Sequence, residues 1–263
     1  MAVNHYQKAF GAWPVLVERA ETQATIYYSE LAELIGIYHR AVTHVLSVIQ
    51  QYCLDEGLPP LTILVVNKKH KAPGPGFIAW QFDNLEEGFE TVYRYDWSQV
   101  LNPFDFAQDG TTPDDLIQKL LEEPEKSGEV YGIVKQRGVA QRLFREALLA
   151  AYDGCAFCGC TFLVALEASH IVPWSLASHD ERLDPRNGLL LCATHHKFFD
   201  NELITLANDY KIEYFDPDGV EDDLSPADQQ LTTDLHGRPA NLPDDSKLRP
   251  LLKYIERHNE RMG

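Results

Sequence analysis

Two short cysteine and histidine motifs constrain the fold of this chain more than any other feature. Cys155 and Cys158 form a C-x2-C pair, and Cys192 and His195 form a C-x2-H pair that begins 34 residues after Cys158. Brought together by a hairpin, the two pairs supply the three thiolates and one imidazole of a closed tetrahedral zinc site. Structural zinc would contribute folding energy to a segment too small to hold a core of its own. The spacing therefore predicts a zinc-stabilised unit in the second half of the chain.

The number and clustering of the cysteines indicate a reducing compartment, and the apolar runs are too short to span a membrane. The chain has 5 cysteines, an odd number, and its cluster at 155–160 does not fit a disulfide framework. Cys160 could replace Cys158 as a zinc ligand, and Cys53 is expected in the core. The N-terminal residues MAVNHYQKAF lack a basic-then-apolar leader. No apolar run approaches the ~20 residues that span a bilayer. We therefore expect a cytoplasmic protein without membrane contact.

The acidic charge of the chain is unevenly distributed. The net charge is −17, from 40 acidic and 23 basic side chains. Residues 1–83 carry a net charge of −1 and residues 131–200 a net charge of zero, whereas 84–130 and 201–263 carry −9 and −7. Strong nonspecific binding to nucleic acid requires basic groups that neutralise phosphates, so the overall charge argues against it. The two near-neutral segments remain able to bind DNA selectively through local basic groups.

The hydropathy pattern of residues 1–83 changes its period several times. Helical periodicity extends over three segments and is followed by a β-branched strand, a basic loop and a returning strand; these segments are 9–22, 30–35, 39–52, 61–66, 68–76 and 77–80. This order resembles a winged helix-turn-helix. The stretch TIYYSELAELIGIYHRAVTHVLSVI also resembles the helical pair of alkyltransferase-like DNA-binding domains.

This resemblance implies a DNA-recognition surface. In such folds the second helix of the pair enters the major groove and the wing contacts the backbone. The implied DNA-binding residues are Arg40, Thr43 and His44 on the helix, and Lys68, Lys69 and Lys71 on the wing. The alternative is a small α+β domain whose surface charges are only solvated.

A second set of polar residues lies between and after the two metal-binding pairs. His170 ends a strand-like run, Asn187 follows 17 residues later, and His196 follows Asn187 by nine. Together with the CAFC, SHIVPW, NGLLLC and HHKFFD segments, this order resembles the HNH endonucleases of the ββα-metal (His-Me finger) superfamily, in particular the bacterial restriction type. The resemblance covers about residues 138–206. It implies that His170 is the general base, that Asn187 supports its ring, and that His196 is a metal ligand.

The chemistry of phosphodiester hydrolysis fits these roles. The reaction needs a base for water and a cation for the developing negative charge, and neutral imidazole is a suitable base near pH 7. Asp200 lies four residues after His196, on the same helix face, and such a pair suits magnesium or manganese. Many members of the family have Asp directly before the base, where this chain has Ser169. We therefore favour Asp200 as the second ligand, with His179 as the weaker candidate. His195 and His196 diverge as helix neighbours, so only His195 joins the zinc site.

The sequence thus predicts an α+β fold with two domains. A winged-helix DNA-recognition domain at 1–83 is joined by an acidic linker at 84–130 to a zinc-stabilised ββα-metal nuclease domain at 131–263, whose core spans 154–206 and whose end is an acidic extension. The expected function is cleavage of double-stranded DNA at a specific site. In one version of this hypothesis, the recognised site contains a modified base. Cutting both strands of the DNA requires two active sites, so a homodimer is expected. The alternatives are a zinc-scaffolded DNA-binding regulator without catalysis and a nonspecific HNH nuclease.

Overall fold

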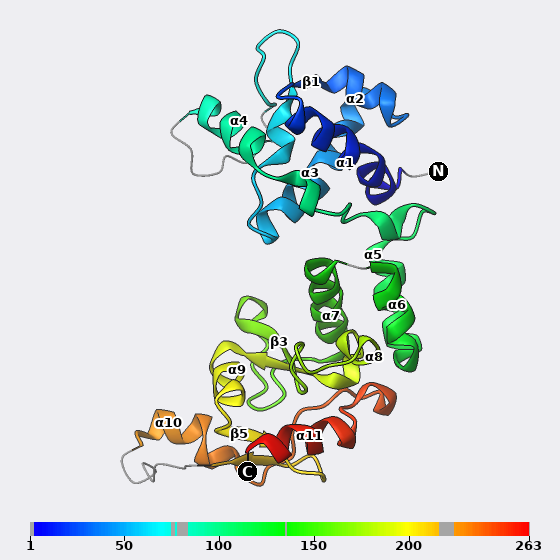
Figure 1. Cartoon of the computed structure of the whole chain (residues 1–263). Coiled ribbons are helices and arrows are strands. Elements are labelled where there is room, and N and C mark those ends of the chain that lie inside the picture. Colours follow the sequence, from blue (N-terminus) through cyan, green and yellow to red (C-terminus); the bar gives the residue numbers. More distant parts are fainter. Residues whose placement is uncertain (1–2, 75–76, 78–83, 135, 216–223, 263) are drawn as a thin grey trace. The chain divides into compact units, whose positions relative to one another are not determined.

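The computed structural model describes residues 3–74, 77, 84–134, 136–215 and 224–262 (Figure 1). The chain divides into two compact units. The N-terminal unit comprises Met1–Pro113 and Ile133–Val139, and the C-terminal unit comprises Asp114–Gly132 and Ala140–Gly263. Within the described ranges, no helix has both the length and the apolar character needed to cross a membrane.

The N-terminal unit is a helical core with two very short strands. Its helices and strands are α1 (His5–Glu21), β1 (Ile26–Tyr27), α2 (Tyr28–Leu34), α3 (Val42–Asp55), β2 (Val65–Val66) and α4 (Leu85–Arg94). Short 3-10 helices lie at His39–Ala41, Leu61–Leu64, Trp97–Gln99 and Asp105–Ala107. Helix α1 starts earlier than its periodicity predicts because the Asn4 side chain accepts hydrogen bonds from the Tyr6 and Gln7 amides. Pro14 consequently lies inside α1 rather than in its first turn.

The part of this unit that resembles a winged helix agrees with the prediction only partly. The two helices of the predicted pair are present as α2 and α3, and Gly36, with φ of +63°, follows α2. The predicted strand at 61–66 is instead a 3-10 turn followed by β2, which pairs in parallel with β1. Of the predicted returning strand, Phe77 has no strand assignment, and 78–80 lie outside the described residues. The winged helix stays a prediction.

The segment predicted as an acidic linker is folded. Trp97 and Phe104 are 2% and 3% exposed, and both rings pack edge-on against Trp13 with centroid distances of 6.0 Å. Burial of these aromatic rings outweighs the solubility of the charges around them. The compact N-terminal unit therefore extends to Pro113, well beyond the predicted boundary at residue 83.

The C-terminal unit contains two hairpins surrounded by helices. Its elements are most of α5 (Pro113–Glu122), part of α6 (Ser127–Val134), most of α7 (Arg137–Ala151), β3 (Leu166–His170), α8 (His179–Arg182), β4 (Gly188–Cys192), α9 (Ala193–Asp200), β5 (Ile204–Leu206), β6 (Ile212–Tyr214), α10 (Pro226–Leu231) and α11 (Leu252–Met262). Short 3-10 helices lie at Pro124–Lys126, Leu163–Ala165, Pro185–Asn187, Thr233–Leu235 and Ser246–Leu248.

A β-hairpin followed directly by a helix forms the centre of this unit. Strands β3 and β4 pair antiparallel, with Leu166 opposite Cys192 and His170 opposite Gly188. Helix α9 begins at the residue after β4. Gly188 permits the close approach of α7, because a Cβ at this position would lie 2.6 Å from Phe144 and 2.7 Å from Leu148. The order strand, strand, helix agrees with the predicted ββα core.

The C-terminal extension packs on this core. The Tyr254 hydroxyl of α11 donates to Asp184 at 2.9 Å, and Tyr254 is 1% exposed. His258 stacks on Phe199 of α9 with a centroid distance of 4.1 Å and parallel rings. Burial lowers the pKa of His258, so this ring is favoured in its neutral form. Helix α11 therefore packs against the face of α9 that carries Phe199.

Candidate functional site

The four predicted zinc ligands converge in the C-terminal unit. The ligand atoms of Cys155, Cys158, Cys192 and His195 all lie within 4.8 Å of one another. The two motifs meet because Cys155 and Cys158 enclose a tight turn, in which the Gly159 amide donates to the Cys155 carbonyl, while Cys192 ends β4. The structure thus brings together residues from the two ends of a 34-residue interval.

The spacing of these atoms fits zinc. A tetrahedral ion with Zn–S bonds of about 2.3 Å holds neighbouring ligand atoms roughly 3.5–3.8 Å apart. The Sγ atoms of Cys158 and Cys192 are 3.8 Å apart, and Cys155 Sγ lies 3.7 Å from His195 Nδ1. Hydrogen bonds from Cys158 and Cys192 hold the pKa of Cys155 well below its usual range, which favours a thiolate in this cluster. The set could hold zinc, with the thiolates and the imidazole as its ligands.

The surroundings of His195 orient it toward this cluster. Its Nε2 donates to the Leu231 carbonyl at 3.0 Å, which leaves Nδ1 to face the sulfur atoms. The side chain is fully buried. Cys160 is outside the cluster, although its carbonyl accepts a hydrogen bond from the Cys155 amide. Cys53 is buried in the other unit, as predicted, and burial raises its pKa to about 12.

The predicted base lies at the opposite end of the hairpin. His170 ends β3, and its ring stacks on Phe144 of α7 with a centroid distance of 3.9 Å and an interplanar angle of 13°. His170 Nε2 donates to the Arg182 carbonyl at 2.9 Å. A carbonyl only accepts, so this contact fixes the proton on Nε2 and leaves Nδ1 as the basic nitrogen.

Asn187 supports this histidine through the backbone of the intervening loop. Its side chain is fully buried. Its Oδ1 accepts from the Val172 amide at 2.9 Å, and its Nδ2 donates to the Glu181 carbonyl at 3.0 Å. These bonds join the residues after His170 to the end of α8, where the Arg182 carbonyl lies. The Asn187 side chain therefore secures the loop. It does not line the pocket that contains His170 and His196.

An open pocket joins His170 to His196. It has a volume of about 290 Å³ and is lined by Gln141, Phe144, Arg145, Glu167, Ala168, His170 and His196. Two residues that the sequence assigns to the reaction thus face one space, although they come from a strand and a helix. The location next to both groups makes this pocket the candidate active site.

Glu167 is an acidic member of this pocket that the sequence analysis missed. Its carboxylate makes a short contact with His196 Nδ1, while Asp200 Oδ2 lies 3.5 Å from His196 Nε2. Asp200 is not among the residues that line the pocket. An acidic residue directly after the apolar run FLVAL, three residues before His170, was the available signal. An imidazole between two carboxylates is a donor set that suits magnesium or manganese.

Ser169, at the position before the base, and His179, the weaker candidate for the second ligand, both lie outside this pocket. Ser169 is 1% exposed, and its hydroxyl has no hydrogen-bond partner among the described residues. His179 packs against the Tyr131 ring at a centroid distance of 5.0 Å.

The predicted DNA-binding residues of the N-terminal unit are all exposed. Arg40 precedes α3, and Thr43 and His44 lie in its first turn. In the basic loop, Lys68 and Lys71 lie 5.4 Å and 4.2 Å from the centre of the Tyr27 ring; Lys69 is exposed beside them. The six predicted residues, all exposed, are Arg40, Thr43, His44, Lys68, Lys69 and Lys71. The structure therefore leaves these groups accessible to a ligand.

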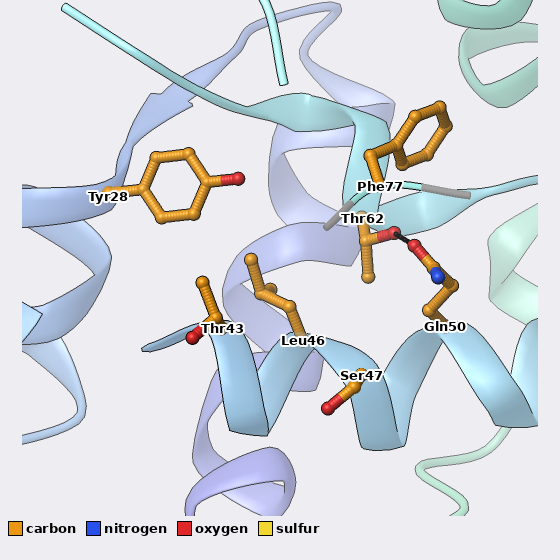
Figure 2. A pocket seen from close by; sticks show the side chains of 7 residues that line it. All are labelled: Tyr28, Thr43, Leu46, Ser47, Gln50, Thr62 and Phe77. Atoms are coloured by element: carbon orange, nitrogen blue, oxygen red, sulfur yellow. Dashed lines mark hydrogen bonds between the residues drawn. The ribbon is translucent and has the colours of Figure 1, made fainter. Parts of the chain in front are cut away.

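A small pocket opens beside Thr43 on α3. Its volume is about 30 Å³, and it is lined by Tyr28, Thr43, Leu46, Ser47, Gln50, Thr62 and Phe77. Figure 2 shows the Tyr28 hydroxyl directed into the space from one side, with Thr62 and Phe77 on the other. The Thr62 hydroxyl donates to Gln50 Oε1 at 3.4 Å. The lining combines two aromatic rings with several hydrogen-bonding groups.

Comparison with known proteins agrees with the geometry of the C-terminal unit. The family model described as HNH endonuclease matches residues 155–207. This segment contains both metal-binding pairs, His170, Asn187, His196 and the ββα core. The C-terminal unit therefore contains an HNH endonuclease-type domain. No curated protein matches the chain.

We predict one zinc ion per chain, held through Cys158 and not through Cys160. The Cys158→Ser variant removes one of four ligands, so its zinc affinity should fall by more than the ~10–100-fold that outer-sphere changes cost. The Cys160→Ser variant is the matched control and should retain zinc. Metal analysis by atomic emission, together with thermal unfolding, measures both effects. Equal zinc content in the two variants would contradict this ligand set.

Proposed function

We propose that the protein is a metal-dependent endonuclease that hydrolyses double-stranded DNA. The single observation that carries this proposal is the pocket shared by His170, at the end of β3, and His196, in the middle of α9. The HNH endonuclease match over the same segment supports it. The finer proposal is a restriction-type enzyme, in which the N-terminal unit selects the site and a homodimer cuts both strands.

In this proposal His170 is the general base. Its Nε2 is occupied by the Arg182 carbonyl, so Nδ1 accepts the proton of the attacking water. Phe144 fixes the plane of the ring by stacking. Asn187 keeps the supporting loop in place, and its effect on the reaction is indirect. Arg145 lines the same pocket, with one guanidinium nitrogen bonded to the Leu166 carbonyl, and supplies positive charge near the phosphate.

The cation that HNH endonucleases require would be held by His196 with a carboxylate. Glu167 is the stronger partner because it lines the pocket together with His170, whereas Asp200 contacts the other ring nitrogen. A bound magnesium-class ion neutralises charge on the phosphate and on the leaving oxygen. The contribution of Glu167 and His196 is to fix the position of that charge relative to His170.

The N-terminal unit would supply recognition. Arg40 and the lysines of the basic loop are exposed and suit contacts with phosphates. Thr43 and His44 on α3 suit hydrogen bonds to the edges of bases. In one version of this proposal the recognised site carries a modified base. The pocket beside Thr43, at about 30 Å³, has room for about two water molecules and is too small to take up a base. In this proposal the exposed Thr43 and His44 side chains therefore make the base contacts.

We predict that His170→Ala abolishes cleavage of plasmid DNA in magnesium or manganese. Loss of a general base costs ~10²–10⁴-fold in rate. The substrates are plasmids with and without defined base modification, and the ends of the products are sequenced. Fragments with defined ends that depend on modification are expected. The His236→Ala variant is the control, because its exposed ring lies in the C-terminal extension.

Two isosteric variants test the cation ligands in the same assay. Glu167→Gln should raise the magnesium concentration needed for half-maximal rate more than Asp200→Asn does. Cleavage at scattered positions would favour the nonspecific nuclease. Specific binding without hydrolysis in any cation, by wild type and His170→Ala alike, would support the regulator and contradict the proposal.

We predict that Arg40→Gln weakens DNA binding several-fold and flattens its salt dependence. Each lost phosphate contact removes about one counterion from the salt slope. Arg94→Gln is the matched control, because Arg94 is an exposed arginine paired with Glu90 on α4. Binding is measured by fluorescence anisotropy across a salt series. Equal slopes for the two variants would place DNA elsewhere than on α3.

A further inference from the structure

Arg182 links the predicted base to a set of aromatic side chains. Its carbonyl accepts the hydrogen bond from His170 Nε2 at 2.9 Å. Its guanidinium donates to the Tyr131 hydroxyl at 2.7 Å. The guanidinium carbon lies 5.4 Å from the centre of the Tyr131 ring and 5.3 Å from that of Trp174. One residue thus contacts His170 through its backbone and two rings through its side chain.

Helix α6 holds the short helix that carries Arg182. The Ser127 hydroxyl donates to the Asp180 carbonyl at 2.6 Å, and Ser127 is 1% exposed. Gly128 allows this approach, since a Cβ there would lie 3.3 Å from Asp180 Cα. Tyr131 is one turn further along α6. Because α8 has four residues and little stability of its own, the position of its last carbonyl depends on such attachments. Those from α6 add to the Asn187 and Arg257 hydrogen bonds to Glu181.

Trp174 completes the contact between this cluster and His170. Its ring meets the His170 ring edge-on, with a centroid distance of 5.7 Å and an angle of 90°. It also contacts Tyr131 at 5.9 Å. With Phe144 stacked on the face of His170, the plane of the imidazole is set by packing. The choice of the nitrogen that carries the proton then depends on the Arg182 carbonyl.

We propose that Tyr131 is a positioning residue for His170 and acts through Arg182. This inference rests on the proposed nuclease function. Tyr131 holds the guanidinium, the guanidinium holds the end of α8, and the carbonyl there keeps the His170 proton on Nε2. Nδ1 is thereby kept ready to accept a proton from water. Tyr131 precedes the segment 155–207 that matches the HNH model, so this support comes from outside the matched segment.

The variant Tyr131→Phe tests this role, because it removes only the hydroxyl. We expect kcat to fall about tenfold while KM and zinc content stay unchanged, since a small displacement of a catalytic group lowers the rate steeply. Arg182→Lys keeps the charge but loses the planar guanidinium, and should behave in the same way. Tyr210→Phe is the matched control; it removes a hydroxyl that donates to the Pro250 carbonyl in the same unit. Its kcat should equal that of wild type.

Nitrogen-15 NMR of the His170 ring gives a readout that does not depend on cleavage. Wild type should show the Nε2–H tautomer, and Tyr131→Phe should show a larger share of the Nδ1–H tautomer. An unchanged tautomer, or a KM increase at constant kcat, would overturn the positioning role. If wild type cleaves no DNA, the nuclease proposal fails, whereas the tautomer comparison still decides whether Tyr131 positions His170.

Discussion

The antiparallel pairing of β3 with β4 is the constraint on which both candidate sites depend. Its register puts Leu166 opposite Cys192 at one end and His170 opposite Gly188 at the other. The zinc ligands therefore gather at one end of the hairpin and the predicted base lies roughly 13 Å away along the strand. A slip of one residue would turn the side chains of one strand to the opposite face and separate His170 from the pocket.

The Cys155, Cys158, Cys192 and His195 cluster, which could hold zinc, and the close packing of α7 support this pairing in different ways. The Cys155 turn and the end of β4 meet at the metal cluster, which would fix the start of α9. At the other end, Gly188 has no side chain, so Phe144 can approach the hairpin and stack on His170. The helix after β4 then presents His195 to the zinc cluster and His196 to the pocket. One short unit thus carries the candidate zinc site and the candidate active site together.

The sequence predicted those features that depend on local spacing. The zinc ligands, the ββα order and the helical pair at α2 and α3 follow from short motifs and periodicity. The features it missed depend on long-range packing. Trp97 and Phe104 lie in a strongly acidic segment, and only their contact with Trp13, more than 80 residues earlier, makes that segment part of a core. Glu167 lies three residues before His170. Only its contact with His196, 29 residues later in the sequence, makes it part of the pocket.

The adjacent histidines His195 and His196 are assigned here to two different metal sites. Manganese binding to the zinc-loaded protein, followed by electron paramagnetic resonance, distinguishes the two sites. Wild type should bind one manganese ion per chain in addition to zinc. His196→Ala should lose the manganese and keep its zinc. Loss of zinc from His196→Ala, or manganese binding equal to that of wild type, would contradict the assignment of these two residues to separate sites.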